Sequence, residues 1–466
     1  MSGTASSTGT MLPTVLASAL FMDLLDTAAL GTALPTMARE FGTDPLHLKL
    51  ALTAYLVTVA ILVPASGWMA ERFGPRRVFS AAMTLFLVGS ACCGLSSSVE
   101  QLVAARILQG VGGAMMTPVA RIIVIAATPR ERLVQALNAF TFPAVFGPLL
   151  GPPLAGLLMS VASWRWIFFI NIPIGIASLL VVRRIVPPLE TRRPDRFDTV
   201  GFVAAATLIL ALLALSESAG SHFLSTDATL WAAGVALLAL LLLVAHVLRV
   251  DAPILELRFL GRRIYRASMI GGAFGRLGLG ALPFLMPLFL QAGLGWSPLE
   301  TGGVMAAQMV GSLAARPAGS LAIQRLGFRG ALLWMGLLTA VFTALPALFT
   351  GATSPWTVGV LMFGIGLTRA AYYVAANPIA FTDFDADEVS RASALATVIQ
   401  QLTLGFGVSL AGFLLFTFSD GGALQLPDFA ATFVALGVVA FMAVVPFLRL
   451  PAHAGAHMRN GGPSHD

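Results

Sequence analysis

Three charged side chains stand out because each falls inside a stretch that is otherwise apolar. Asp23 and Asp26 lie three residues apart in the first apolar stretch, and Arg106 lies in the fourth. Residues three apart share one face of a helix. A carboxylate inside a membrane is costly unless it is paired, hydrated or protonated, so intramembrane acids often carry protons. Asp26 is therefore a candidate proton carrier, and Asp23 is a second candidate.

Arg106 is the natural partner of Asp26 if the two helices touch, because an arginine in hydrocarbon must find an acceptor. Competition between this arginine and a proton for the carboxylate would link protonation to helix position. A structural alternative remains open for both residues. Asp26 would then form a fixed ion pair that holds helices together, and Arg106 would be satisfied by backbone carbonyls.

The elements that must position these charges are membrane-spanning helices. The chain has 466 residues, of which 57% are hydrophobic and only 11% charged. Apolar runs of about 20 residues, each able to cross a bilayer, follow one another. We therefore predict an all-α polytopic membrane protein with fourteen transmembrane helices. The predicted spans are 12–34, 46–69, 77–97, 100–121, 134–160, 165–184, 200–218, 229–248, 266–291, 299–323, 328–349, 355–377, 393–417 and 427–449.

The distribution of basic residues predicts the orientation. Most of the 28 Lys and Arg residues fall in connections that would share one side of the membrane. Because cytoplasmic connections carry the excess of basic residues, both termini are expected in the cytoplasm, with the protein in the cell (inner or plasma) membrane. The arginines form no stripe along one face, so nucleic acid is not an expected partner.

Two short matches indicate an internal repeat. Residues 72–74 (RFG) are similar to residues 325–327 (RLG), and 155–158 (AGLL) to 411–414 (AGFL), at nearly one offset. Such duplication is typical of transporters that bind substrate between two halves. The predicted domains are a six-helix bundle at 1–185, an inserted two-helix segment with Arg-rich flanks at 186–262, a second six-helix bundle at 263–450 and a cytoplasmic tail at 451–466.

Small residues mark the predicted fifth span as a close-packing helix. Gly147, Gly151 and Ala155 recur every four residues, so a neighbouring helix can approach its backbone. Prolines, among them Pro148, should bend or loosen this helix. In the connection after the second span, Gly67 and Gly74 would permit a tight turn, and an acid at Glu71 would complement a helix dipole.

A substrate cavity is only weakly marked. Phe142 and Phe146 in the fifth span, Gln308 in the tenth and Tyr372 in the twelfth could line an apolar pocket. Aromatic residues at such spacing more often face lipid or the protein core. Arg316 and Arg369, also inside spans, offer counter-charges for an anionic substrate.

Five stretches together resemble the major facilitator superfamily, in particular its fourteen-helix drug:proton antiporter branch. They cover almost the whole chain. Residues 25–35 look like the first-helix signature, and 67–77 (GWMAERFGPRR) like the loop motif, with Glu71 where Asp is usual. Residues 106–114 (RILQGVGGA) match the fourth-helix motif. Residues 147–156 (GPLLGPPLAG) resemble the exporter motif, with Pro152 where a second Gly is common, and 164–175 (WRWIFFINIPIG) are similar to the fourteen-helix branch.

The resemblance implies a major facilitator fold and proton-coupled efflux of amphipathic drugs or antibiotics by alternating access. It implies proton coupling at Arg106, a gating role for the loop with Gly67, Glu71, Arg72 and Gly74, and an exporter motif that includes Gly147, Pro148, Gly151 and Gly156. The expected partners are a small amphipathic substrate, protons and membrane lipids, and a periplasmic adaptor protein is left open.

Other classes of function compete with this interpretation. A dedicated exporter of one endogenous metabolite is the nearest alternative, and a non-transporting receptor is a more distant one. The only lysine, Lys49, lies in no GxxxxGK[ST] motif, which excludes an ATP-driven pump. No enzyme, metal site or cofactor is expected, and the proton gradient would supply the energy.

Overall fold

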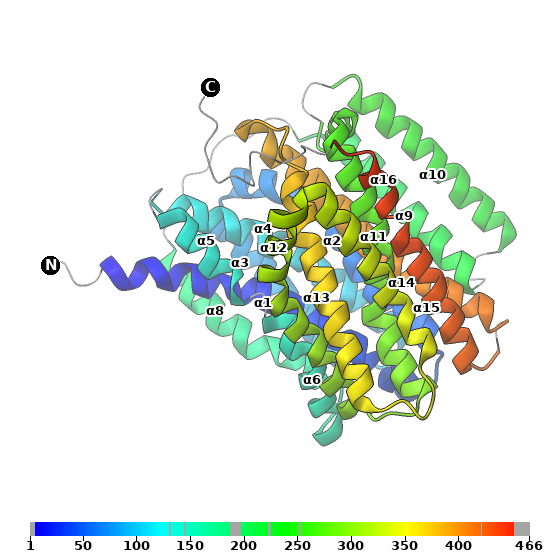
Figure 1. Ribbon diagram of the computed structural model, residues 1–466. Helices are drawn as coiled ribbons and strands as arrows, with labels where there is room; N and C mark the ends of the chain where they lie inside the picture. Colours follow the sequence, from blue (N-terminus) through cyan, green and yellow to red (C-terminus); the bar gives the residue numbers. More distant parts are fainter. Residues whose placement is uncertain are drawn as a thin grey trace. The chain divides into compact units, whose positions relative to one another are not determined.

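The computed structural model describes residues 5–129, 132–143, 146–186, 197–221, 225–250, 253–420 and 422–451. Within these residues the chain is helical and contains no strand (Figure 1). Thirteen of the described helices are long and apolar enough to cross a membrane. The chain forms two compact units, Met1–Thr199 with Ser297–Gly302, and Val200–Trp296 with Gly303–Asp466.

The first unit contains the first six predicted spans. Its helices are α1 (Ala5–Phe41), α2 (Pro45–Phe73), α3 (Pro75–Leu95), α4 (Val99–Ala127), α5 (Leu133–Thr141), α6 (Phe146–Val161), α7 (Trp166–Phe169) and α8 (Asn171–Ile185). Short polar caps set where they begin. The side chain of Asp44 accepts a hydrogen bond from the Leu46 backbone N–H at the start of α2, over 2.7 Å. Ser98 does the same for Gln101 at the start of α4.

The predicted fifth span corresponds to α5 and α6, and residues 135–161 are long and apolar enough to cross a membrane. Phe142 and Pro143 lie outside both helices. Pro143 has no backbone N–H to donate, so one hydrogen bond of a regular helix is missing at this position.

The second unit contains the predicted inserted pair and the last six spans. Its helices are α9 (Thr199–Ser221), α10 (Thr226–Val247), η3 (Leu257–Gly261), α11 (Arg263–Leu288), η4 (Phe289–Gly293), α12 (Pro298–Ala344), η5 (Leu345–Leu348), α13 (Pro355–Ile379), α14 (Ala386–Phe418), α15 (Leu426–Phe441) and α16 (Val444–Leu448). The predicted tenth and eleventh spans together form α12, which breaks at Gly327, where φ is 69° and ψ is 172°. Glycine adopts this positive φ without strain.

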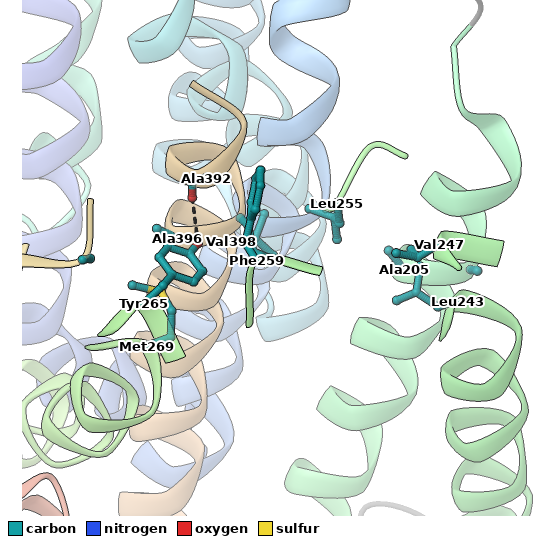
Figure 2. Close-up of a cluster of buried hydrophobic side chains, with 13 residues drawn as sticks. Ala205, Leu243, Val247, Leu255, Phe259, Tyr265, Met269, Ala392, Ala396 and Val398 are labelled. Atoms are coloured by element: carbon teal, nitrogen blue, oxygen red, sulfur yellow. Dashed lines mark hydrogen bonds between the residues drawn. The ribbon is translucent and has the colours of Figure 1, made fainter. Parts of the chain in front are cut away.

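A buried apolar cluster ties the inserted pair to the second unit. It draws residues from α9, α10, α11 and α14 (Figure 2). Ala205 of α9 lies beside Leu243 and Val247 of α10, and the Tyr265 hydroxyl donates to the Ala392 carbonyl over 2.8 Å. The inserted pair is thus part of one compact unit with the later helices. The finer division at 186–262 and 263–450 stays a prediction.

Helices α12 and α13 of the second unit cross at backbone contact. A Cβ atom at Gly366 would lie 1.7 Å from the Gln308 carbonyl oxygen. We therefore expect Gly366→Ala to push the helices apart and to lower the free energy of unfolding by about 1–3 kcal/mol, the usual cost of overpacking. Thermal unfolding of the purified protein in detergent measures this loss.

Gly359→Ala is the matched control on the same helix, because the nearest atom to its new Cβ would be Val304 Cγ1 at 3.8 Å. Equal melting temperatures for the two variants would contradict the predicted close contact.

Candidate functional site

An ion pair between Asp26 of α1 and Arg106 of α4 lies at the centre of the candidate site. Arg106 Nη1 donates to Asp26 Oδ2, and both side chains are fully buried. Arg106 Nε also donates to the Ala51 carbonyl of α2, over 3.2 Å. The predicted contact between Asp26 and Arg106 is therefore present. The proton-coupling role of the two residues stays a prediction.

Two buried amides complete the environment of the Asp26 carboxylate. Gln109 Nε2 donates to Asp26 Oδ1 over 3.0 Å, and Asn171 Nδ2 of α8 donates to the same oxygen over 3.1 Å. Gln109 Oε1 accepts from Arg106 Nη1 at 2.7 Å, and Asn171 also donates to Ser90 of α3. Asp26 thus accepts hydrogen bonds from three side chains, one of which is the cation Arg106.

Asp23 has a different environment from Asp26, although it lies only three residues earlier. Its Oδ1 accepts a hydrogen bond from the Tyr55 hydroxyl of α2, and it is only partly buried. The guanidinium carbon of Arg106 lies 4.3 Å from the centre of the Tyr55 ring. Tyr55 therefore contacts Asp23 through its hydroxyl and Arg106 through its ring face. The two acids and Arg106 form one connected group.

The small residues of the fifth span pack as predicted. A Cβ at Gly147 would lie 2.9 Å from the Phe21 carbonyl oxygen, and one at Gly151 would lie 2.8 Å from Ala28 Cβ, so α6 contacts the backbone of α1. A Cβ at Gly156 would lie 2.5 Å from the Pro298 carbonyl oxygen, in the segment Ser297–Gly302 of the same unit. Pro148 lies in the first turn of α6.

The loop between the second and third spans differs in part from expectation. Gly74 forms the turn, with φ of 89°, between the end of α2 and the start of α3. The expectation for Gly67 was wrong: it lies inside α2 and no atom comes within 4 Å of a Cβ built there. Glu71 and Arg72 are exposed in the last turn of α2. Glu71 is therefore not at the start of α3, where it would complement that helix dipole. The gating role of the loop stays a prediction.

The candidate cavity residues are divided between the two units. Phe142 is 60% exposed and contacts Phe146 edge to face in the first unit. In the second unit, Gln308 is buried against α13, and Tyr372 is 1% exposed and donates its hydroxyl hydrogen to the Gly271 carbonyl. Tyr372 belongs to a buried apolar cluster in this conformation. The structure does not describe the Arg316 side chain.

A second polar group closes the far end of α1, and sequence reasoning missed it. Trp164, Arg165 and Trp166 are residues of the types that anchor a helix where it enters a membrane. Trp164 is instead buried, and its Nε1 donates to Glu40 Oε2 over 2.6 Å. Arg165 forms an ion pair with Glu40 and donates to the Ser96 carbonyl. Trp166, by contrast, is 53% exposed, as an anchor would be.

Asn171 and Tyr55 are the other functional residues that the sequence analysis did not select. Each is a polar side chain inside a predicted apolar span, and that is the signal that could have identified it. A single polar residue does not reveal which helix its side chain faces, so its partner was not predictable without the structure.

Comparison with known proteins gives the class of this molecule. The family model described as Major Facilitator Superfamily matches residues 16–255 and 268–462. The chain therefore belongs to the Major Facilitator Superfamily, whose members are membrane transporters and not enzymes. With its many spanning helices it is a multi-pass membrane protein.

Two relatives have the printed name "Putative multidrug resistance protein MdtD". The one from Pectobacterium carotovorum subsp. carotovorum (strain PC1) is 36% identical over 447 residues, which cover 94% of this chain and 95% of the relative. The one from Escherichia coli O81 (strain ED1a) is 36% identical over 449 residues, covering 94% of both chains.

Solved structures of transporters share the fold. A bacterial homologue of the human lysosomal transporter Spinster, in an inward-facing conformation, aligns with a TM-score of 0.68 at 15% identity, covering 96% of this chain and 99% of that one. The inward-open xylose transporter XylE from E. coli aligns with a TM-score of 0.63 at 15% identity, covering 96% and 98%. These likenesses confirm the predicted major facilitator fold.

The buried pair makes a prediction about stability. Arg106→Gln should lower the free energy of unfolding by about 3–5 kcal/mol, because it leaves the Asp26 carboxylate buried without its cation. The double variant Asp26→Asn with Arg106→Gln should recover much of this loss, since no uncompensated charge remains. Denaturant or thermal unfolding in detergent measures both effects.

The control is Arg77→Gln, which removes an exposed arginine of the same unit. If the double variant were as unstable as Arg106→Gln alone, the buried charge would not be the cause of the loss.

Proposed function

We propose that this protein exports small amphipathic compounds across the cell membrane in exchange for protons. The observation that carries this proposal is the fully buried Asp26–Arg106 pair with a partly exposed acid, Asp23, one helical turn away. A protein without transport has little reason to keep such costly groups inside a membrane. The names of the relatives support export of drugs as the broad type of transport.

In the proposed mechanism, a proton and Arg106 compete for one carboxylate. When Asp26 is ionised, Arg106, Gln109 and Asn171 hold α1, α4 and α8 together through it. A protonated Asp26 no longer pairs with the cation, so the packing that depends on this pair loses stability. Protonation would thus favour a different arrangement of the helices.

Asp23 is the proposed exit point for the proton, because it lies one helical turn nearer the cytoplasmic start of α1 than Asp26. It is the more exposed acid, and Tyr55 connects it to Arg106. Asp23 accepts a hydrogen bond from a neutral hydroxyl, whereas Asp26 accepts from a guanidinium and two amides. Protonation of Asp23 would weaken its hydrogen bond with the Tyr55 hydroxyl and change the contact of the Tyr55 ring with Arg106.

The orientation belongs to the same proposal. Both termini are placed in the cytoplasm because basic residues concentrate in the connections of that side. The proton gradient across the cell membrane is then the energy source, and protons enter from the outside while the cargo leaves. A periplasmic adaptor as a further partner remains open, as does export of one endogenous metabolite as the biological task.

Transport in inside-out vesicles with an imposed proton gradient tests the proposal. Wild-type vesicles should accumulate ethidium, a lipophilic cation, or 2-naphthoate, an aromatic carboxylate, above vesicles that lack the protein. Asp26→Asn should abolish the gradient-dependent part, because its side chain can no longer exchange a proton. Asp23→Asn should slow it, because the proposed exit point of the proton is lost.

Asp44→Asn is the control, since it removes an acid of the first unit while asparagine still caps α2. Full gradient-driven transport by both Asp26→Asn and Asp23→Asn would exclude this group as the coupling site. Wild-type vesicles that move neither probe, or move them without a gradient, would contradict proton exchange.

A further inference from the structure

A second arginine is buried in the membrane-spanning part of the chain, in the second unit. Arg276 is 4% exposed and lies near the middle of α11, a helix of 26 residues. At 1.5 Å per residue it is about 20 Å from either end of that helix. A cation at this depth carries a large cost unless an anion compensates it.

No such anion is present among the described residues of the second unit. Arg276 Nη2 donates to the amide oxygen of Asn377 on α13 over 3.1 Å, and Nη1 has no hydrogen-bond partner. No described carboxylate lies within 4.0 Å of its guanidinium nitrogens. Arg106 in the first unit differs in this respect, because it pairs with Asp26. Arg276 thus keeps its charge and one donor nitrogen uncompensated.

The surroundings of Arg276 are built from a bare face of α11 and an aromatic, basic stripe of α13. A Cβ at Gly272 would lie 2.5 Å from Arg276 Nη1, so the guanidinium rests against the bare backbone of Gly272. On α13, Arg369, Tyr373 and Asn377 recur every four residues and so share one face. The guanidinium carbon of Arg276 lies 5.2 Å from the Tyr373 ring centre, and Arg369 and Tyr373 are partly exposed.

We propose that Arg276 binds the carboxylate of an anionic amphipathic cargo, with Asn377 and Tyr373 completing the site. The buried Nη1 has no hydrogen-bond partner, so a carboxylate that reached it would form a charge-assisted hydrogen bond and neutralise the buried cation. Tyr373 supplies an aromatic surface for the apolar body of the ligand. Arg369 on the same stripe adds attraction for anions and disfavours cations. The inference rests on the proposed export function, because it names the charge class of its cargo.

Equilibrium binding to the purified full-length chain in detergent tests the site without any gradient. The probe is radiolabelled 2-naphthoate, with 2-naphthamide and 2-naphthylmethylamine as competitors of the same shape and different charge. We expect saturable binding of the carboxylate, and competition by the amide that is weaker by about tenfold or more, since that difference corresponds to one charge-assisted contact. The amine should compete least of all.

Two variants locate the binding. Arg276→Gln should reduce 2-naphthoate binding to the level of the amide. Asn377→Asp changes only one atom type and places a fixed carboxylate beside Arg276, so it should also abolish binding while preserving the shape of the site. Arg329→Gln is the control, because Arg329 belongs to the same unit but donates to the Leu448 carbonyl at an exposed position.

The outcomes separate this inference from the proposed exchange of protons. Unchanged 2-naphthoate binding in folded Arg276→Gln, or equal binding of the carboxylate and the amide by the wild type, would overturn the anion site. If Arg276→Gln does not fold, Asn377→Asp decides by the same criterion. If 2-naphthoate binding depends on Arg276 but the proton gradient never drives 2-naphthoate transport, the anion site stands and proton exchange is rejected. If Arg276→Gln still transports ethidium in response to the gradient and the wild type binds no carboxylate, proton exchange stands and the anion site is rejected.

Discussion

The first unit depends on one constraint, which is the cost of keeping the Asp26 and Arg106 charges away from water. A bare ion pair does not repay desolvation unless its remaining donors and acceptors are also satisfied. The Ala51 carbonyl of α2, the Gln109 amide of α4 and the Asn171 amide of α8 meet most of this requirement, and Arg106 Nη2 is left without a hydrogen-bond partner among the described residues. Four helices therefore meet at a single carboxylate and its cation.

The same constraint accounts for the small residues around the pair. Donors reach a buried carboxylate only if the helix backbones lie close together. A Cβ at Gly89 of α3 would lie 2.6 Å from the Gln109 backbone, and one at Gly112 of α4 would lie 2.5 Å from the Phe86 backbone nitrogen. Larger residues at these places would separate α3 from α4 and admit water. Close packing and the electrostatics of the site are thus one requirement and not two.

The sequence allowed the charged part of the site to be predicted, because charges inside apolar spans have few possible partners. Asp26 and Arg106 were paired on that argument alone, and Gly147 and Gly151 were placed against a neighbouring helix by their spacing. Asn171 and Tyr55 escaped prediction because their roles depend on how α8 and α2 are rotated about their axes. The expectation for Gly67 failed because a glycine near a turn has the same appearance in sequence whether it lies in the turn or, as Gly67 does, about two helical turns before it.

The fold was more predictable than the site, since span length and the number of apolar runs follow directly from the thickness of a bilayer. The irregular points of the fold were not predictable from the sequence. The break of α12 depends on the backbone dihedral angles of one residue, Gly327. Trp164 shows the same limit for side chains. Its composition and position fitted a membrane anchor, yet the carboxylate of Glu40 at the end of α1 makes it part of the protein interior.

The charges of the two units also bear on the energetics of the proposed exchange. Moving one elementary charge across the membrane is worth about 2.3 kcal/mol per 100 mV. Export of a monovalent cation for one entering proton moves no net charge, so the membrane potential does not drive it. Export of a monovalent anion for one entering proton moves two charges in the favoured direction, and the potential then contributes twice that amount. If Arg276 selects an anionic cargo, one carboxylate that accepts one proton would therefore be enough for the membrane potential to drive export. No second proton site would be required.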